Sequence, residues 1–148
     1  MVGGTGLYSR AVVENFDFKD PQKIQARKYD VLQIALMPPK EWLEVRIAAR
    51  NSERFQQGMI AELEKLLGQG VCEKWLRGLG YEYKLNLRLM YGAPPEEYWR
   101  DFSIQSMQYA KRQRTWFKKE KHTIFLEDPS KFLDECISLV NKWLSPTP

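Results

Sequence analysis

Apolar residues recur at helical spacing through the middle of the chain. From Trp42 they keep a mostly helical spacing as far as Gly68, where a glycine favours a stop. Pro39 suits the first turn of this helix, because its missing N–H would have no partner there. The pattern therefore predicts a long helix with one break, around Asn51 and Ser52.

Four further segments carry a helical pattern, so the chain is expected to be mainly helical. The pair Pro94-Pro95, followed by two glutamates, is a strong helix start, since acidic side chains in a first turn interact favourably with the helix dipole. The four segments are 7–14 after a glycine turn, 71–90 with interruptions at Gly78 and Gly80, 94–119, and 132–144, which Pro129 opens and Ser145-Pro146 ends.

Two short apolar runs have the length and composition of buried strands. Val31 to Leu36 lies between Asp30 and a Met-Pro-Pro sequence, and Ile124 to Leu126 follows a basic segment. These runs predict an α/β fold, predominantly helical, with two or three short parallel strands left from a larger sheet. The two runs can pair only if no other strand lies between them.

Length and composition favour a single domain. A chain of 148 residues with 43% hydrophobic residues can bury its own core. No run approaches the ~20 apolar residues of a membrane-spanning helix, and the N-terminus lacks a signal-peptide pattern. We therefore expect a cytoplasmic protein without membrane partners, with a polar connector at Lys19 to Lys28.

The cysteines and the single histidine do not form a chemical motif. Cys72 and Cys136 lie far apart in the sequence, and His122 is the one histidine of the chain. A structural zinc site or a His/Cys catalytic pair needs more such residues at characteristic spacing. The cysteines are expected to be ordinary reduced thiols.

Almost all of the excess positive charge lies in one short segment. The net charge is +4, from 23 basic and 19 acidic residues. Between Tyr109 and His122, six basic residues stand against Glu120 alone, which gives +5 and leaves −1 for the rest of the chain. Such a concentration is typical of a surface that contacts a polyanion. The six residues are Lys111, Arg112, Arg114, Lys118, Lys119 and Lys121.

The first candidate for chemistry is the glycine turn, Gly3-Gly4-Thr5-Gly6. Glycine N–H groups can approach a phosphate closely, the N-terminus of the following helix favours negative charge, and Thr5 could add a hydroxyl donor. The motif is not a Walker A sequence, because it lacks the Gly-Lys-Ser/Thr ending. The alternative interpretation is a tight turn that only opens a helix.

The second candidate is a row of arginines at four-residue spacing, Arg46, Arg50 and Arg54. On a helix these like charges destabilise one another unless solvent or an anion compensates. A diphosphate is one such anion, because guanidinium groups bind phosphate oxygens in bidentate fashion. A solvated row helped by Glu53 explains the spacing equally well.

The third candidate is the basic segment at the end of the helix predicted over 94–119. Lys111, Arg114 and Lys118 share one helical face and can neutralise phosphates, while Gln113 can hydrogen-bond a base edge. Aromatic residues at helical spacing can stack on bases or pack in a core, and spacing alone leaves both possibilities open. The remaining residues are Arg112 and Lys119 beside the basic face, and Phe102, Tyr109 and Trp116 on another face.

Taken together, motifs near both ends resemble the tRNA dimethylallyltransferase family. The first covers residues 2–8, Val-Gly-Gly-Thr-Gly-Leu-Tyr, and the second covers 109–117, Tyr-Ala-Lys-Arg-Gln-Arg-Thr-Trp-Phe. Three intermediate features follow the family order, so the resemblance covers most of the chain. They are the run 31–36 before a Pro-rich helix start, Arg46-Ile47-x-x-Arg50 with Gly58-Met59-Ile60, and Leu79-Gly80-Tyr81.

The resemblance implies a P-loop NTPase-like α/β domain with helical additions. The family transfers a dimethylallyl group from its diphosphate to N6 of the adenosine on the 3′ side of the tRNA anticodon, with Mg²⁺. Thr5 and Arg50 match residues that hold the diphosphate, and 111–113 match the helix near the tRNA. The expected roles are catalytic for Thr5 and Arg50, diphosphate-binding for Gly3, Gly4, Gly6 and Arg46, and RNA-binding for Lys111, Arg112, Gln113, Arg114 and Lys118.

The departures from the family pattern imply a partial domain. The family's P-loop and its aspartate base lie upstream of the glycine turn, little of its helical insertion remains, and Ser106-Met107 stands where a Thr-Arg pair is usual. We expect the glycine turn and a helix over 1–18, the C-terminal strand and helices over 29–148, and the Mg²⁺ ligands outside this chain. A separately encoded N-terminal half would complete the enzyme.

Two rival functions remain open at this stage. A non-catalytic RNA-binding module would keep the basic segment and dispense with the phosphate site. A truncated gene product would have no function of its own. The DNA upstream of Met1 distinguishes these cases, because an in-frame P-loop there would make the chain a fragment.

Overall fold

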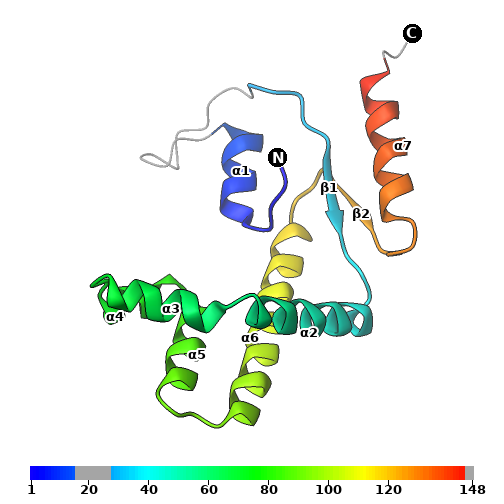
Figure 1. The fold of residues 1–148 in the computed structure, drawn as a ribbon. Helices are drawn as coiled ribbons and strands as arrows, with labels where there is room; N and C mark the ends of the chain where they lie inside the picture. Colours follow the sequence, from blue (N-terminus) through cyan, green and yellow to red (C-terminus); the bar gives the residue numbers. More distant parts are fainter. Residues whose placement is uncertain (16–27, 146–148) are drawn as a thin grey trace. The chain divides into compact units, whose positions relative to one another are not determined.

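The computed structural model describes residues 1–15 and 28–145, and within them seven helices and two strands follow one another (Figure 1). The connector expected at Lys19 to Lys28 lies outside the described residues except for its last residue. In chain order the elements are α1 (Gly6–Glu14), β1 (Gln33–Leu36), α2 (Lys40–Gln56), α3 (Met59–Gly68), α4 (Glu73–Leu79), α5 (Tyr81–Met90), α6 (Pro95–Phe117), β2 (Thr123–Leu126) and α7 (Phe132–Leu144).

The chain forms two compact units. The helical unit comprises Lys40–Ala110, with α2, α3, α4, α5 and most of α6. The flanking unit combines the described residues of Met1–Pro39 and Lys111–Pro148, with α1, both strands, the last turns of α6, and α7. The glycine turn and the basic segment thus belong to the flanking unit, and the arginine row belongs to the helical unit.

The helical unit is organised around two apolar clusters. The first contains Met59, Leu85, Tyr98 and Phe102, and its aromatic rings lie in tilted contact, with Tyr98 and Phe102 centroids 5.5 Å apart. The second contains the three fully buried leucines at 63, 76 and 87. Burial of side chains of this size stabilises a fold by roughly 1.5–3 kcal/mol each, so these clusters dominate the stability of the unit.

Two helix boundaries differ from the sequence expectation. The break expected around Asn51 and Ser52 is wrong, because α2 continues through both residues and ends at Gln56. The chain turns instead at Gly58, whose φ of 101° lies in the left-handed region that a glycine adopts without a steric penalty. The segment 71–90 is interrupted at Gly80 but not at Gly78, which lies within α4.

The flanking unit contains the predicted pair of parallel strands. β1 and β2 lie side by side in Figure 1. They pair in parallel from Gln33 opposite Thr123 to Leu36 opposite Leu126. The ladder continues past β1, where Met37 N–H donates to the Leu126 carbonyl at 2.7 Å. Both predicted strands are therefore confirmed, and they pair directly. β1 begins two residues later than expected, and β2 begins one residue earlier.

Helix α7 presents an apolar stripe that remains exposed. It covers Phe132–Leu144, as predicted, and contains no buried residue. Leu133, Ile137 and Leu144 lie along one face and are 72%, 50% and 65% exposed. Parallel sheets are normally covered on both faces, so this stripe and the two-stranded sheet have the composition of surfaces meant for burial.

No helix in residues 1–15 and 28–145 combines the length and the apolar character required to cross a bilayer.

Candidate functional site

Thr5 occupies the N-cap position of α1. Its backbone is extended, with φ −87° and ψ 101°, and its carbonyl accepts the N–H groups of Tyr8 and Ser9 at 3.1 and 3.2 Å. The exposed Thr5 hydroxyl makes no capping hydrogen bond. The N–H groups of Gly6 and Leu7, at the first two positions of the helix, lack intrahelical acceptors, so they and the hydroxyl form a set of donors suited to an anion.

The glycine turn packs directly against the end of α6. The Gln113 side-chain amide donates to the Gly4 carbonyl at 3.0 Å. A Cβ added to Gly4 would overlap the same amide group, and a Cβ added to Gly6 would overlap the indole ring of Trp116. The closeness of α6 therefore requires glycine at position 6, and a side chain at position 4 would displace the flexible end of Gln113. Neither interpretation of the turn from sequence had included this closeness.

The basic segment divides into exposed and engaged side chains. Lys111, Arg112 and Lys118 are exposed. Arg114 is half-buried, and its guanidinium donates to the Pro38 carbonyl at 3.0 Å, which ties α6 to the end of the strand pair. Gln113 is engaged by Gly4, so the segment combines a solvent-facing cationic surface with two internal contacts. The RNA-binding roles of these five residues remain predictions.

The aromatic residues of α6 have different environments. Phe102 is fully buried in the first apolar cluster, where it packs as a core residue. Trp116 is half-buried against Gly6 and meets Phe117 edge-on, with centroids 4.9 Å apart. Tyr109 keeps 42% of its surface exposed. Packing therefore accounts for Phe102 and Trp116.

The arginine row lies on α2 in the helical unit. Arg46 is exposed, with its guanidinium 5.7 Å from the centroid of the Trp42 ring. Arg54 forms an ion pair with Glu82 at 2.7 Å, so its partner is a carboxylate of α5. Arg50 is exposed and lies between them along the helix, where its guanidinium reaches the Asn51 side-chain oxygen at 3.4 Å. Arg46 and Arg50 thus remain available to an anion.

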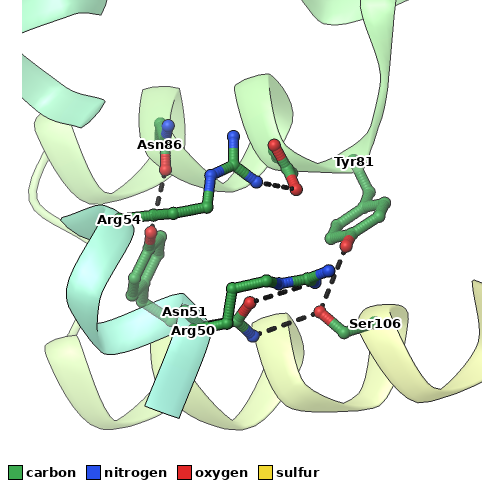
Figure 2. Close-up of polar contacts among 8 residues, drawn as sticks. Arg50, Asn51, Arg54, Tyr81, Asn86 and Ser106 are labelled. Atoms are coloured by element: carbon green, nitrogen blue, oxygen red, sulfur yellow. Dashed lines mark hydrogen bonds and ion pairs between the residues drawn. The ribbon is translucent and has the colours of Figure 1, made fainter. Parts of the chain in front are cut away.

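A buried polar network supports the Arg50 position, and sequence reasoning missed it. The Asn51 amide donates to the Ser106 hydroxyl at 3.2 Å, and the Tyr81 hydroxyl lies 3.1 Å from the same oxygen. Figure 2 shows Asn51 connecting Arg50 to Ser106. Asn51 and Ser106 are each only 2% exposed. The sequence signal for this network was Ser106, a polar residue four positions after the core residue Phe102 and therefore on the same buried face of α6.

A second buried polar pair lies nearby in the helical unit. The Tyr98 hydroxyl donates to the Asn86 side-chain oxygen at 2.9 Å (Figure 2). Burial raises the pKa of Tyr98 to about 12, because the phenolate would lose its hydration. The hydroxyl therefore stays protonated at neutral pH, and it acts as a structural donor.

The helical unit also contains an open pocket of about 520 Å³ between α4, α5 and α6. Its arginines are already paired, because Arg77 contacts Glu73 and Arg88 contacts both Glu97 and Asp101. The predicted site residues do not line it. We assign it no role in binding the diphosphate.

The predicted site residues fall into two groups, one in each unit. The flanking unit brings Gly4, Thr5, Gly6 and Gln113 together, and the helical unit carries Arg46 and Arg50. The residues described by the structure include no group of three or more His, Cys, Asp or Glu side chains that could hold a metal ion. The Mg²⁺ implied by the resemblance is assigned no step.

Comparison with known proteins identifies relatives along most of the chain. The sequence profile of the IPP transferase family matches residues 17–120. A tRNA dimethylallyltransferase of Corynebacterium jeikeium (strain K411) is 28% identical over 132 residues, which cover 86% of this chain and 43% of that protein. The tRNA dimethylallyltransferase 2 of Treponema denticola is 38% identical over 100 residues, covering 65% of this chain and 34% of that protein.

Two solved structures share the fold. A tRNA delta(2)-isopentenylpyrophosphate transferase from Staphylococcus epidermidis is 29% identical and superposes with a TM-score of 0.65 over 78% of this chain and 40% of its own. The full-length tRNA isopentenylpyrophosphate transferase from Bacillus halodurans is 25% identical, with a TM-score of 0.66 over 80% of this chain and 41% of its own. These neighbours confirm the expected P-loop NTPase-like fold, mainly helical with two parallel strands.

The chain spans about two fifths of the Corynebacterium relative and of both solved structures. The profile match includes the arginine row and the basic segment as far as Glu120, while the glycine turn precedes it. Because the match covers well over half of the 148 residues, the chain belongs to the IPP transferase family.

Proposed function

We propose that this chain contributes the diphosphate-binding turn and the RNA-contacting helix of a tRNA dimethylallyltransferase. The reaction transfers a dimethylallyl group from dimethylallyl diphosphate to N6 of the adenosine on the 3′ side of the anticodon. The observation that carries this proposal is the Thr5 N-cap. Its exposed hydroxyl makes no capping hydrogen bond and lies beside the Gly6 and Leu7 amides at the start of α1, while the basic end of α6 packs against the same turn.

The chemistry of the transfer explains these donors. The allylic C–O bond breaks, a C–N bond forms to N6, and the electron pair of the broken bond leaves with the diphosphate. Negative charge therefore grows on the diphosphate oxygens, and preplaced N–H, hydroxyl and guanidinium donors stabilise the transition state. Thr5 and Arg50 are assigned as catalytic on this basis, with Gly3, Gly4, Gly6 and Arg46 around the diphosphate. The amine proton goes to a base outside the assigned residues.

The proposed RNA partner is the anticodon stem-loop of tRNA. Lys111, Arg112 and Lys118 are exposed on the flanking unit, and lysine and arginine contacts to phosphates supply most of the affinity for RNA without regard to sequence. Cationic side chains beside the turn would also raise the local concentration of the polyanion.

A further polypeptide segment would complete the site. The 148 residues contain no Gly-x4-Gly-Lys-Ser/Thr sequence, and by resemblance that P-loop segment, with the base and the Mg²⁺ ligands, precedes the glycine turn. The exposed apolar stripe of α7 and the exposed strand residues Leu36, Ile124 and Phe125 are suited to contact with such a segment, whether it is covalently attached or separately encoded.

Prenyl transfer to unmodified tRNA tests the proposal. The chain is assayed alone and with a polypeptide that carries the family's P-loop segment, using radiolabelled dimethylallyl diphosphate. We expect transfer only in the mixture, and we expect Arg50→Ala to abolish it while Arg100→Ala, an exposed arginine outside the row, does not. Absence of transfer in every mixture would contradict an enzymatic role.

A non-catalytic RNA-binding module is the second candidate. It is favoured by the +5 segment together with the absent P-loop sequence. Filter binding of an anticodon stem-loop without prenyl transfer in any mixture would support this role. Affinity that does not change with salt would count against it, because phosphate contacts release counterions. A chain that showed neither activity would match a truncated product without a function of its own.

A further inference from the structure

We propose that Gln113 and Trp116 are positioning residues of the diphosphate site, which clamp the glycine turn so that the Thr5 donors keep one orientation. The proposal rests on the diphosphate-binding role proposed above for that turn. It gives Gln113 a function distinct from the RNA contact predicted from sequence. Both contacts lie within the flanking unit.

The glycines of the turn differ physically from the glycines of the helical unit. Gly58, Gly70 and Gly92 adopt left-handed φ angles of 101°, 83° and 91°, with no atom closer than 3.8 Å to the position of an added Cβ. Gly4 and Gly6 do not have left-handed φ angles, so an alanine could adopt their backbone conformation. At Gly6 the rigid Trp116 ring excludes a side chain, whereas at Gly4 a side chain would displace the flexible end of Gln113. Close contact with α6 thus explains glycine at position 6, and at position 4 it makes the Gln113 hydrogen bond depend on glycine.

The hydrogen bond from Gln113 orients the Thr5 amide. It is accepted by the Gly4 carbonyl, which belongs to the same rigid peptide plane as the Thr5 N–H. Because the carbonyl and the N–H of a trans peptide point in opposite directions, an acceptor fixed toward Gln113 fixes the Thr5 N–H away from it. Donation to the carbonyl also polarises the peptide group, which makes its N–H a stronger donor.

Trp116 holds the other side of Thr5. Its indole lies against Gly6, the first residue of α1, and the ring is itself fixed by an edge-on contact with Phe117 at an interplanar angle of 80°. The residue between the two contacts is Thr5. Catalytic donors must be held in place before the charge develops, because reorienting them during the reaction would cost the stabilisation that they provide.

A series of variants that add or remove side-chain volume between the turn and α6 tests the clamp in the full chain. The variants are Gly4→Ala, Gln113→Ala and the double variant, with Gly78→Ala as a control in α4 where nothing lies within 4 Å of an added Cβ. Amide proton–nitrogen correlation spectra monitor Thr5 and Gly6, and inorganic pyrophosphate is the titrated probe. Trp116→Leu is measured in the same way.

The expected results separate positioning from folding. Gln113→Ala should shift the Thr5 and Gly6 amide signals and weaken pyrophosphate binding roughly fivefold, the loss of one neutral hydrogen bond. Gly4→Ala should weaken binding to a similar extent, because the added methyl displaces the flexible end of Gln113 from the Gly4 carbonyl. The double variant should bind about as weakly as either single variant, since both substitutions remove the same hydrogen bond. Signals of the helical unit should stay unchanged, as should binding in Gly78→Ala.

Two outcomes would overturn the clamp. One is a Gly4→Ala variant whose Thr5 and Gly6 amide signals do not shift. The other is a double variant whose fold-loss of pyrophosphate affinity equals the product of the two single losses. If wild-type protein failed to bind pyrophosphate while its turn amides still responded to Gln113→Ala, the diphosphate role of the turn would fail, and the role of the clamp in diphosphate positioning would fail with it. If pyrophosphate bound equally tightly to wild type and to Gln113→Ala, the positioning role would be refuted and the proposed function would still stand.

Discussion

The helical unit and the flanking unit bury their side chains to different extents. In the helical unit, Leu63, Leu76, Leu87 and Phe102 are fully buried, and the buried polar groups of Asn51, Asn86 and Ser106 all have side-chain partners. In the flanking unit, α7 has no buried residue, and Leu133 is 72% exposed. The helical unit is therefore stabilised by its own interior, whereas the flanking unit depends on a few specific contacts.

This difference bears on where function lies. The glycine turn and the basic segment both belong to the unit with the smaller interior, and they are joined by side-chain contacts with the end of α6. A site built in this way can accept a large substrate and a further polypeptide surface. The helical unit, in contrast, presents Arg46 and Arg50 on a helix that is anchored by its core.

The largest expected effect is on the stability of the helical core. Phe102→Ala should lower the free energy of unfolding by about 3–5 kcal/mol, because it removes a fully buried ring and leaves a cavity. Ile137→Ala, in the exposed stripe of α7, should change it by less than about 0.5 kcal/mol. Urea denaturation followed by circular dichroism measures both. Equal losses would contradict the difference between the units.

The next effect concerns the polar network beneath Arg50. Ser106→Ala should lower the free energy of unfolding by about 1–3 kcal/mol, because it leaves the Asn51 amide and the Tyr81 hydroxyl without their shared partner. Ser138→Ala, on the exposed surface of α7, is the matched control and should be nearly neutral. If the two serine variants unfolded at the same urea concentration, the network would have no role in stability.

A smaller effect appears at alkaline pH. Burial raises the pKa of Tyr98 to about 12, so its protonated form stabilises the fold fully below the unfolded pKa of 10.0. That contribution is lost as pH rises from 10.0 toward about 12. Tyr98→Phe should therefore be less stable at neutral pH, where the bond to Asn86 is missing, yet lose less stability on alkalisation. Urea titrations across this range measure the slopes.

Part of the loss of stability at alkaline pH should persist in the Tyr98→Phe variant. Burial also raises the pKa of Tyr83, and a hydrogen bond to Glu73 raises the pKa of Tyr91. Identical alkaline slopes for wild type and variant would show that Tyr98 contributes nothing to this decline.

The smallest effect concerns the salt dependence of RNA binding. Lys111→Ala and Lys118→Ala should each reduce the slope of log affinity against log salt by about 1, because each removes one phosphate contact. Lys65→Ala, an exposed lysine of α3 outside the basic segment, should leave the slope unchanged. Filter binding of an anticodon stem-loop gives the slopes, and equal values for all three variants would argue against a localised RNA surface.

The sequence predicted elements well where local signals agreed. Helix α7 has the predicted bounds, because an unbroken apolar period ends at Ser145, and the strand pair follows from two apolar runs. The break assigned to Asn51 was wrong, since a polar residue within an apolar pattern was interpreted as a loop. Asn51 instead pairs with Ser106 in the interior, 55 residues away.

The candidate site was predictable in its residue types but not in its contacts. The sequence indicated Thr5 and the basic segment through their chemistry and family motifs. It could not show that Gln113 reaches Gly4, because 109 residues separate them and no periodicity connects the two positions. It also offered only backbone freedom or a tight turn as reasons for glycine, whereas Gly6 is required by the proximity of Trp116.

The most direct test of the central claim is a crystal structure of the chain with a non-reactive analogue of dimethylallyl diphosphate. The account predicts that the Thr5 hydroxyl binds an oxygen of the diphosphate, with Gln113 still bonded to Gly4. An analogue bound elsewhere, or a Thr5 hydroxyl turned away from the diphosphate, would contradict it.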